Sequence, residues 1–101
     1  MNFEILRAHV LTWADKRDLL MPANARIQML KVVEEVGELA SALLKNKQSE
    51  TKDALGDVLV TLIILSEQLD LDLIDCLELA YNEIRLREGE TINGTFIKST
   101  C

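Results

Sequence analysis

The sequence has few of the residues that make turns, strands and covalent cross-links. Its 101 residues include one proline, four glycines and two cysteines, and aromatic residues make up only 4%. Such a composition favours a few long helices over many short strands. Cys76 and Cys101 form no CxxC pair, so the chain has no thiolate metal motif. We expect them to be a core thiol and a tail thiol in a reducing compartment.

Long apolar runs are also missing. The longest is Val58–Leu65, which contains Thr61 as its only polar member. It falls far short of the ~20 residues that span a bilayer. The first ten residues carry Glu4, Arg7 and His9, which does not fit a signal peptide. We therefore expect a cytoplasmic protein without a membrane partner.

Positive charge is scarce, with 11 Lys and Arg against 17 Asp and Glu, a formal net charge of −6 and a pI near 4.7. This balance opposes general nucleic-acid binding. A phosphate-bearing small molecule is compatible with it where acidic side chains hold a metal ion that reverses the local charge. The apolar share of 49% is enough for one domain over residues 1–101 with its own core.

Apolar periodicity predicts four helices, at about residues 3–16, 25–45, 49–69 and 73–88. Ser49 is the predicted N-cap of the third helix and Asp72 that of the fourth. Gly89 is expected just past the end of the fourth helix. The Asn93-Gly94 pair between β-formers is compatible with a small C-terminal hairpin.

The third predicted helix is apolar on every side over Val58–Leu65. A helix of this kind must be buried all round. Four short helices seldom enclose one of their number completely, so a second subunit is expected to cover the remaining face. The sequence therefore predicts a homo-oligomer, either a homodimer or a homotetramer.

Three glutamates gather in the middle of the second predicted helix, in the stretch Glu34-Glu35-Val36-Gly37-Glu38. On a helix, Glu38 lies next to both Glu34 and Glu35. Like charges at these spacings cost about a few tenths of a kcal/mol per pair unless something neutralises them. Since the flanking residues are apolar, the cluster favours a hard cation such as Mg²⁺ or Mn²⁺.

The third predicted helix carries Asp53 and Asp57 at i, i+4. Asp57 shares its side with Val60 and Ile64, where a carboxylate is costly unless it is paired or bound to metal. A hairpin of the second and third helices would place the two acidic sets opposite each other. This predicts a carboxylate metal site inside the bundle. The alternative is two acidic clusters on solvated helix faces.

Together these residues resemble the EExxE…ExxD signature of the all-α nucleotide pyrophosphohydrolases, which include MazG-like enzymes, dimeric dUTPases and phosphoribosyl-ATP pyrophosphohydrolases. The likeness covers about residues 3–90 and includes the stretches 31–40, 53–60 and 80–87. It implies an all-α, four-helix bundle-like MazG-type fold. It also implies Mg²⁺-dependent hydrolysis of nucleoside triphosphates, deoxynucleotides in particular, to the monophosphate and pyrophosphate, in house-cleaning of the nucleotide pool.

The resemblance also implies residue roles. Glu35, Glu38 and Asp57 would be metal ligands, and Glu34 would be a further ligand or the base that orients the attacking water. The candidate contacts to nucleotide or phosphate are Lys31, Lys45, Asn82 and Arg85. Trp13 is a further candidate because its ring could stack on a base, although its apolar stripe is more typical of a core residue.

One position departs from the family pattern. The ExxD part of the signature expects Glu three residues before Asp57, and the chain has Ala54 there. Asp53 is the candidate replacement, although its side chain is shorter and points to a different side of the helix. The departure leaves the number of metal ions open. It also keeps two alternatives in view: a non-catalytic module that binds metal and nucleotide, and a purely structural helical oligomer.

Overall fold

The computed structural model describes residues 1–99, which form four α-helices, a short 3-10 helix and a β-hairpin. The all-α fold class and the small C-terminal hairpin are confirmed. Cys101, the expected tail thiol, lies outside the described residues. The elements in chain order are α1 (Phe3–Asp15), η1 (Pro22–Asn24), α2 (Ala25–Leu44), α3 (Gln48–Gln68), α4 (Leu73–Ile84), β1 (Gly89–Ile92) and β2 (Thr95–Lys98).

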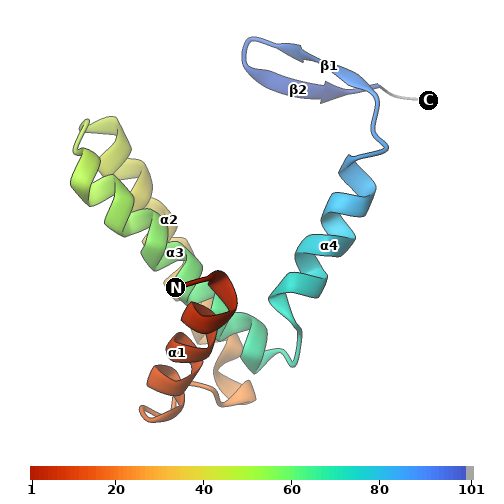
Figure 1. Cartoon of the computed structure of the whole chain (residues 1–101). Helices are drawn as coiled ribbons and strands as arrows, with labels where there is room; N and C mark the ends of the chain where they lie inside the picture. The colour runs from red at the N-terminus through yellow and green to blue at the C-terminus, as the bar shows by residue number, and fades with distance from the viewer. Residues whose placement is uncertain (100–101) are drawn as a thin grey trace.

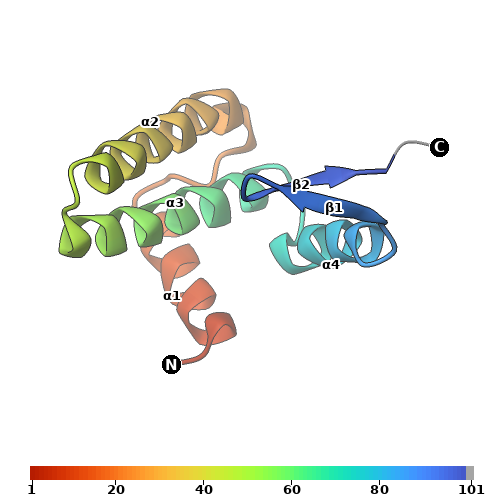
Figure 2. The ribbon, with the colours of Figure 1, turned by 90° about the horizontal axis from the view of Figure 1, so that it is seen from above.

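The centre of the molecule is the antiparallel pair of α2 and α3 (Figure 1, Figure 2). α1 packs across α3 near the end of the pair that is closer to η1, and within residues 1–99 it does not touch α2. α4 leaves the end of α3 and diverges from the pair, so that the chain has the shape of a V in Figure 1. The hairpin follows at the far end of α4.

The core is small and lies along the α2–α3 pair, with Ala14 contributed by α1. Its buried apolar side chains are Ala14, Val32, Ala42, Ala54, Ile63 and Ile64. Gln68 is the buried polar residue, and its Nε2 donates to the Leu19 carbonyl over 2.7 Å. Within residues 1–99 no large side chain is completely enclosed. The radius of gyration is 16.3 Å, compared with about 13 Å for a compact chain of 100 residues.

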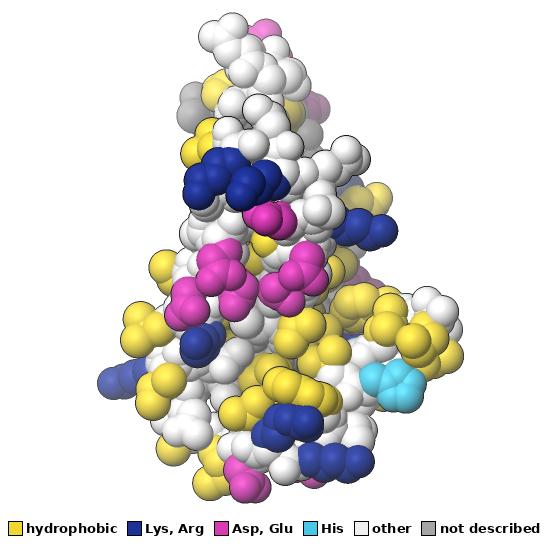
Figure 3. All heavy atoms as spheres, turned by 90° about the vertical axis from the view of Figure 1, so that its left-hand side faces the viewer, with side chains coloured by type: hydrophobic (Ala, Val, Ile, Leu, Met, Phe, Trp, Pro, Cys, Tyr) yellow, Lys and Arg dark blue, Asp and Glu magenta, His cyan; other side chains and the backbone are white. Residues whose placement is uncertain are grey.

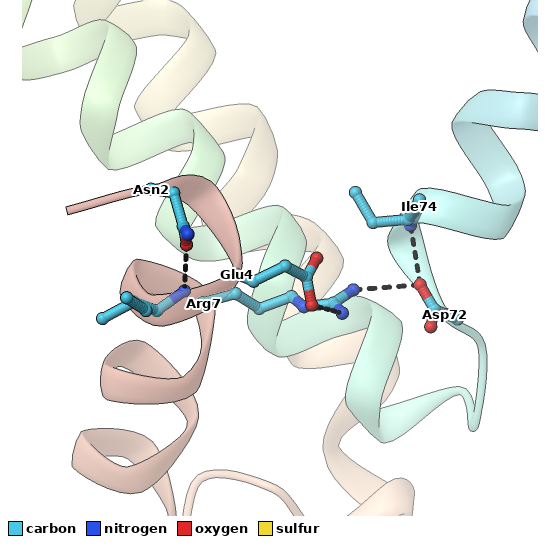
Figure 4. A network of polar contacts seen from close by, with 6 residues as sticks. Asn2, Glu4, Arg7, Asp72 and Ile74 are labelled. Atoms are coloured by element: carbon cyan, nitrogen blue, oxygen red, sulfur yellow. Dashed lines mark hydrogen bonds and ion pairs between the residues drawn. The ribbon is translucent and has the colours of Figure 1, made fainter.

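An ion pair fixes the start of the α4 arm (Figure 4). Arg7 on α1 donates to Asp72 over 2.9 Å and to Glu4 over 2.7 Å. Asp72 is the N-cap of α4, as predicted, and accepts a hydrogen bond from the backbone N–H of Ile74 over 2.8 Å. One carboxylate therefore both starts α4 and ties it to α1.

Three helix ends use a left-handed residue other than glycine. Asp18, Asn46 and Asp70 have φ values of 57°, 56° and 55°. At each of these residues two backbone hydrogen bonds close the C-terminal end of the helix. At Asn46, for example, the Lys47 N–H donates to the Ala42 carbonyl and the Asn46 N–H donates to the Leu43 carbonyl. These turns stop the helices sharply without a glycine.

Two predictions about where helices begin and end are wrong. The third helix begins at Gln48 with Lys47 as its N-cap, and the Ser49 side chain does not cap it. The fourth helix ends at Ile84, earlier than predicted, and Gly89 opens β1. A Cβ at Gly89 would collide with the Ile97 carbonyl and the Phe96 ring on the facing strand, so glycine is needed for strand pairing there. Asn93 and Gly94, with φ of 51° and 79°, form the predicted tight turn.

α4 is exposed along most of its length. Leu73 and Ile74 at its start are half-buried, while later apolar residues such as Leu77, Tyr81 and Ile84 are exposed. Cys76, expected in the core, is exposed as well, because no other element of residues 1–99 covers this part of the helix. Among the described residues, no helix combines the length and apolar character needed to cross a membrane.

Candidate metal centre

The helical hairpin of α2 and α3 positions the acidic side chains. Ala42 and Ala54 are both buried between the helices, so that the two backbones approach closely near the acidic residues. The connection over residues 45–47 is short because Asn46 adopts the left-handed conformation. The predicted antiparallel arrangement of the two acidic helices is therefore present.

The three glutamates of α2 form a compact group. Glu34, Glu35 and Glu38 each offer a carboxylate oxygen within 4.8 Å of the others. Glu34 and Glu38 are exposed, while Glu35 is half-buried on the side of α2 that turns toward α3. Lys31 lies one turn before them, with its Nζ 3.5 Å from a Glu34 oxygen. Three carboxylates this close together repel one another unless a cation joins them.

Glu35 is the carboxylate whose surroundings best fit a cation. Its Oε2 is buried and has no hydrogen-bond donor among residues 1–99. Burial raises the pKa of Glu35 above 4.5, and the negative charges of Glu38, Asp57 and Glu34 raise this pKa further. A buried carboxylate oxygen without a donor is costly. A divalent cation would both satisfy this oxygen and offset the neighbouring charges, so the residues present fit a Mg²⁺ or Mn²⁺ site.

α3 brings its aspartates to the same region. Asp57 is half-buried, and its charge reaches Glu35 across the helix pair. Asp53 is exposed, one turn closer to the connection between the helices. Asp57 and Asp53 thus share a hollow with Glu38, while the three carboxylates that lie within 4.8 Å of one another all belong to α2.

A hollow of about 320 Å³ opens beside the carboxylates. It brings Lys45, a predicted phosphate contact, together with the acidic residues. Sequence reasoning missed Ser41 and Glu50 in its wall, although Ser41 lies on the same helical face as Glu38 and Lys45. The lining residues are Glu38, Ser41, Ala42, Lys45, Glu50, Asp53, Ala54 and Asp57.

A second, shallow hollow of about 470 Å³ also includes Asp53 and Asp57. Its lining residues all lie on α3 and include Lys52, which sequence reasoning also missed. Figure 3 shows acidic side chains gathered in the middle of one face, with basic side chains above them and a mixture of hydrophobic and basic side chains below. Basic side chains therefore lie on both sides of the acidic group.

The position of the missing glutamate is buried in the hairpin. Ala54 is 7% exposed and lies in the wall of the first hollow. A methyl group there provides no ligand, while the neighbouring Asp53 lines both hollows. The structure is thus compatible with Asp53 acting near the metal, from the rim of the hollow.

Three predicted substrate contacts do not meet the carboxylates within one chain. Asn82 and Arg85 lie on or just after α4, which contacts α3 but not α2 within residues 1–99. Trp13 lies on α1, where it is 47% exposed and covered by the guanidinium of Arg17, 4.3 Å from the ring centre. Trp13 is therefore neither the core residue suggested by its apolar stripe nor a neighbour of the acidic group.

A further hollow of about 420 Å³ lies where α1, α3 and α4 meet. Its walls include the acidic residues Glu67, Asp70, Asp72 and Asp75, together with Arg7. Arg7 is already paired with Glu4 and Asp72. With no cation left over in its wall, this hollow is a poor site for a phosphate.

Comparison with known proteins gives the family. Residues 25–90 match the family model described as the MazG nucleotide pyrophosphohydrolase domain. This range contains all five candidate metal ligands and the fourth helix. No solved structure matches the chain significantly.

The chain is also similar to an uncharacterized 18.2 kDa protein in the rep-hol intergenic region of Haemophilus phage HP1 (strain HP1c1), with 39% identity over 71 residues. The alignment covers 70% of this chain but 44% of the phage protein, so the chain spans less than half of that relative. The family model covers more than half of the chain, including both helices of the candidate metal centre: the chain belongs to the MazG nucleotide pyrophosphohydrolase family.

Proposed function

We propose that this chain hydrolyses nucleoside triphosphates, deoxynucleotides in particular, to the monophosphate and pyrophosphate in a Mg²⁺-dependent reaction. The observation that carries the proposal is the buried, donor-free Oε2 of Glu35 within a compact group of carboxylates. Membership of the MazG family supplies the reaction class. The biological role that follows is house-cleaning of the cytoplasmic nucleotide pool.

Glu35, Glu38 and Asp57 would hold Mg²⁺, with Mn²⁺ as a substitute. When bound, the ion supplies positive charge that offsets the phosphates and makes water more acidic. Asp53 is a further candidate ligand from the rim of the first hollow. Carboxylates from both helices would thus surround one small region of the α2–α3 hairpin.

Glu34 is exposed at the edge of the group and is the candidate base. It would accept a proton from the attacking water as the oxygen of that water forms a bond to the α-phosphorus. The bond between this phosphorus and the bridging oxygen breaks, and pyrophosphate leaves with the electron pair. Lys31 pairs with Glu34 and would orient its carboxylate.

Lys45 and Ser41 lie in the same hollow as Glu38 and Asp57. An ammonium group and a hydroxyl are suitable partners for phosphate oxygens. We therefore assign the leaving pyrophosphate to this end of the site. Asn82, Arg85 and Trp13 remain candidate nucleotide contacts that a single chain does not bring to the carboxylates.

The proposed active form is a homodimer or homotetramer. α3 is apolar all round over residues 58–65, and one chain covers only part of it: Ile63 and Ile64 are buried while Leu59 is 45% exposed. The large radius of gyration and the exposed α4 support the same proposal. A chain with this much uncovered apolar surface needs a partner to exclude water from it.

A non-catalytic module that binds metal and nucleotide is the second candidate. Ala54 favours it, because the glutamate of the family signature is absent from the wall of the hollow. The two candidates share the metal site and differ in turnover.

The test is a screen of canonical and modified nucleoside triphosphates for pyrophosphate release, with and without Mg²⁺. We expect Mg²⁺-dependent release with at least one substrate and none from Glu38→Gln. Glu67→Gln, on α3 but outside the site, is the matched control and should remain active. Binding of triphosphates without release would identify the non-catalytic module.

Thermal melting tests the metal site separately from turnover. A ligand that binds only the native state stabilises it by about 2.7 kcal/mol at a hundred times its Kd. We therefore expect millimolar Mg²⁺ or Mn²⁺ to raise the melting temperature. An unchanged melting temperature with both ions would contradict the metal centre itself.

A further inference from the structure

We propose that Glu50 supplies the carboxylate that the family signature places at the position of Ala54. The inference rests on the metal centre proposed above and names a further residue of this chain that acts on the same ion. It concerns metal binding, so it can be tested without nucleotide and without turnover.

Glu50 lies on the face of α3 that carries the other candidate ligands of this helix. It precedes Ala54 by one helical turn and Asp57 by two, at i, i+4 and i+7. Glu50 also stands three residues before Asp53, which is the spacing of Glu and Asp in the family signature. The acidic pair of the signature is thus repeated one turn closer to the connection between the two helices.

Glu50 and Ala54 line the same hollow, together with Glu38 from α2. Ala54 is 7% exposed, and its methyl group leaves open the space that a glutamate side chain would fill. Side chains on a helix point toward its N-terminus, so a glutamate at this position would place its carboxylate over the preceding turn. That turn begins at Glu50. The side chain of Glu50 therefore starts from the region that the signature carboxylate would reach.

The charge of the hollow indicates that Glu50 needs a cation. Carboxylates outnumber ammonium groups in its wall by four to one: Glu38, Glu50, Asp53 and Asp57 against Lys45. Glu50 pairs with Lys47 over 3.8 Å, and both side chains are more than half exposed. An exposed pair of this kind contributes little. A pyrophosphate at Lys45 would add negative charge, which a divalent cation shared by α2 and α3 would offset.

Glu50 fits this role better than Asp53 does. The Asp53 side chain is shorter by one methylene group, and it also lines the second hollow, whose residues all lie on α3. Glu50 lines the hollow that α2 and α3 share and is not part of the second one. A ligand that joins the two helices must face the shared hollow, so we assign the missing carboxylate to Glu50.

The experiment measures Mn²⁺ binding to the nucleotide-free, full-length chain, from the electron paramagnetic resonance signal of free Mn²⁺. Glu50→Gln removes the charge and keeps the shape of the side chain, and it should weaken Mn²⁺ affinity by at least about tenfold. Glu67→Gln is the matched control, because it changes an exposed glutamate of the same helix outside the shared hollow and should leave the affinity unchanged. Melting curves in a chelator check that both variants fold.

A relocated carboxylate tests the position itself. The double variant Glu50→Gln with Ala54→Glu returns the acid to the signature position and should recover the affinity that Glu50→Gln loses. A folded double variant that binds Mn²⁺ no better than Glu50→Gln would contradict the assignment. Weaker binding by Asp53→Asn but not by Glu50→Gln would overturn it in favour of Asp53.

The outcomes separate this proposal from the metal centre on which it rests. A wild-type chain that binds no Mn²⁺ would overturn both. Equal affinity of wild type and Glu50→Gln, with loss of binding in Glu38→Gln, would overturn the role of Glu50 and leave the metal centre in place.

Discussion

Arg7 and Asp72 are joined by a 2.9 Å hydrogen bond although 65 residues separate them in the sequence. The pair connects α1 to the N-cap of α4, while α4 beyond Ile74 is exposed within residues 1–99. Hydrogen bonds from Arg7, and next from the Ile74 N–H, lower the pKa of Asp72. Its carboxylate therefore contributes to stability as an ion-pair partner and as a helix cap.

Substitutions of Asp72 should separate these two contributions. Asp72→Asn keeps a good capping side chain but loses the ion pair, and Asp72→Ala loses both. We expect the free energy of unfolding at neutral pH to fall in the order wild type, Asp72→Asn, Asp72→Ala. Because folding lowers the pKa of Asp72, the ion-pair contribution is present above the unfolded-state pKa and is lost as pH falls through the folded-state value.

Urea denaturation of the three proteins at several pH values provides the measurement. The difference between wild type and Asp72→Asn should shrink in acid. A difference that stays constant down to the lowest pH at which the protein folds would show that the ion pair contributes nothing.

Glu35 predicts the opposite pH dependence for the metal-free protein. Folding raises its pKa above 4.5, so the ionised form is disfavoured in the folded state. The metal-free protein should lose stability as pH rises from about 4.5 through the raised pKa. Glu35→Gln should abolish this part of the loss, because the amide does not ionise.

Thermal melting in a chelator from acid to neutral pH checks this prediction. The curves for wild type and Glu35→Gln should diverge as pH rises, with the variant more stable at neutral pH. Parallel curves would mean that Glu35 is solvated in the metal-free protein.

Glu38→Gln and Asp57→Asn should separate function from stability. Each replaces a charged ligand by an amide of nearly equal shape, and turnover should fall by at least about 100-fold. The metal-free variants should be no less stable than wild type, because the substitution relieves repulsion between neighbouring carboxylates. Pyrophosphate release and chelator-treated melting curves measure the two effects. A fully active Glu38→Gln variant would overturn the site assignment.

Asp53 is a candidate replacement for the glutamate that the family signature has at the position of Ala54. If Asp53 acts near the metal from the rim of the hollow, Asp53→Asn should raise the Mg²⁺ concentration needed for half-maximal activity while leaving activity at high Mg²⁺. A titration of pyrophosphate release against Mg²⁺ provides this value. An unchanged titration would make Asp53 a solvated neighbour and leave Glu50 and Asp57 as the candidate ligands from α3.

Asn46 controls the geometry of the connection between the two helices that carry the candidate metal ligands. It has φ of 56°, a conformation that costs an ordinary side chain about 1–2 kcal/mol and glycine almost nothing. Asn46→Gly should therefore leave the protein equally stable or raise its unfolding free energy by up to about 1 kcal/mol. Asn46→Ala should lower it by about 1 kcal/mol. Urea denaturation of both variants tests the sign, and a stabilising Asn46→Ala would contradict the left-handed turn.

The sequence predicted helix bounds best where a long apolar periodicity was compatible with few alternatives. The start of α2 at Ala25 and the Asp72 cap of α4 are confirmed. α1 differs from its predicted range by one residue at its C-terminal end, and α3 by one residue at each end. The end of α4 was misplaced because Gly89 serves the hairpin, where a side chain would strike Phe96. Local sequence cannot reveal a collision with a residue on another strand.

Some features of the candidate site were predictable from the sequence and others were not. The proximity of Glu34, Glu35 and Glu38 follows from helical spacing and was predictable. The burial of Glu35 Oε2 and the inclusion of Ser41 in a hollow depend on how closely Ala42 and Ala54 let the helices approach. The course of α4 was not predictable because its direction is set by Arg7, on an element far away in the sequence.

All candidate metal ligands lie on one helical hairpin, over residues 34–57, joined by the short turn at Asn46. Contacts between neighbouring elements require little loop closure, and chains rich in such contacts fold quickly. We therefore expect this hairpin to form early, and it then concentrates negative charge before the other elements dock. A divalent cation would offset the negative charge of these carboxylates at this stage. It should therefore increase the folding rate as well as slow unfolding. The metal would then assist folding before it acts as a cofactor.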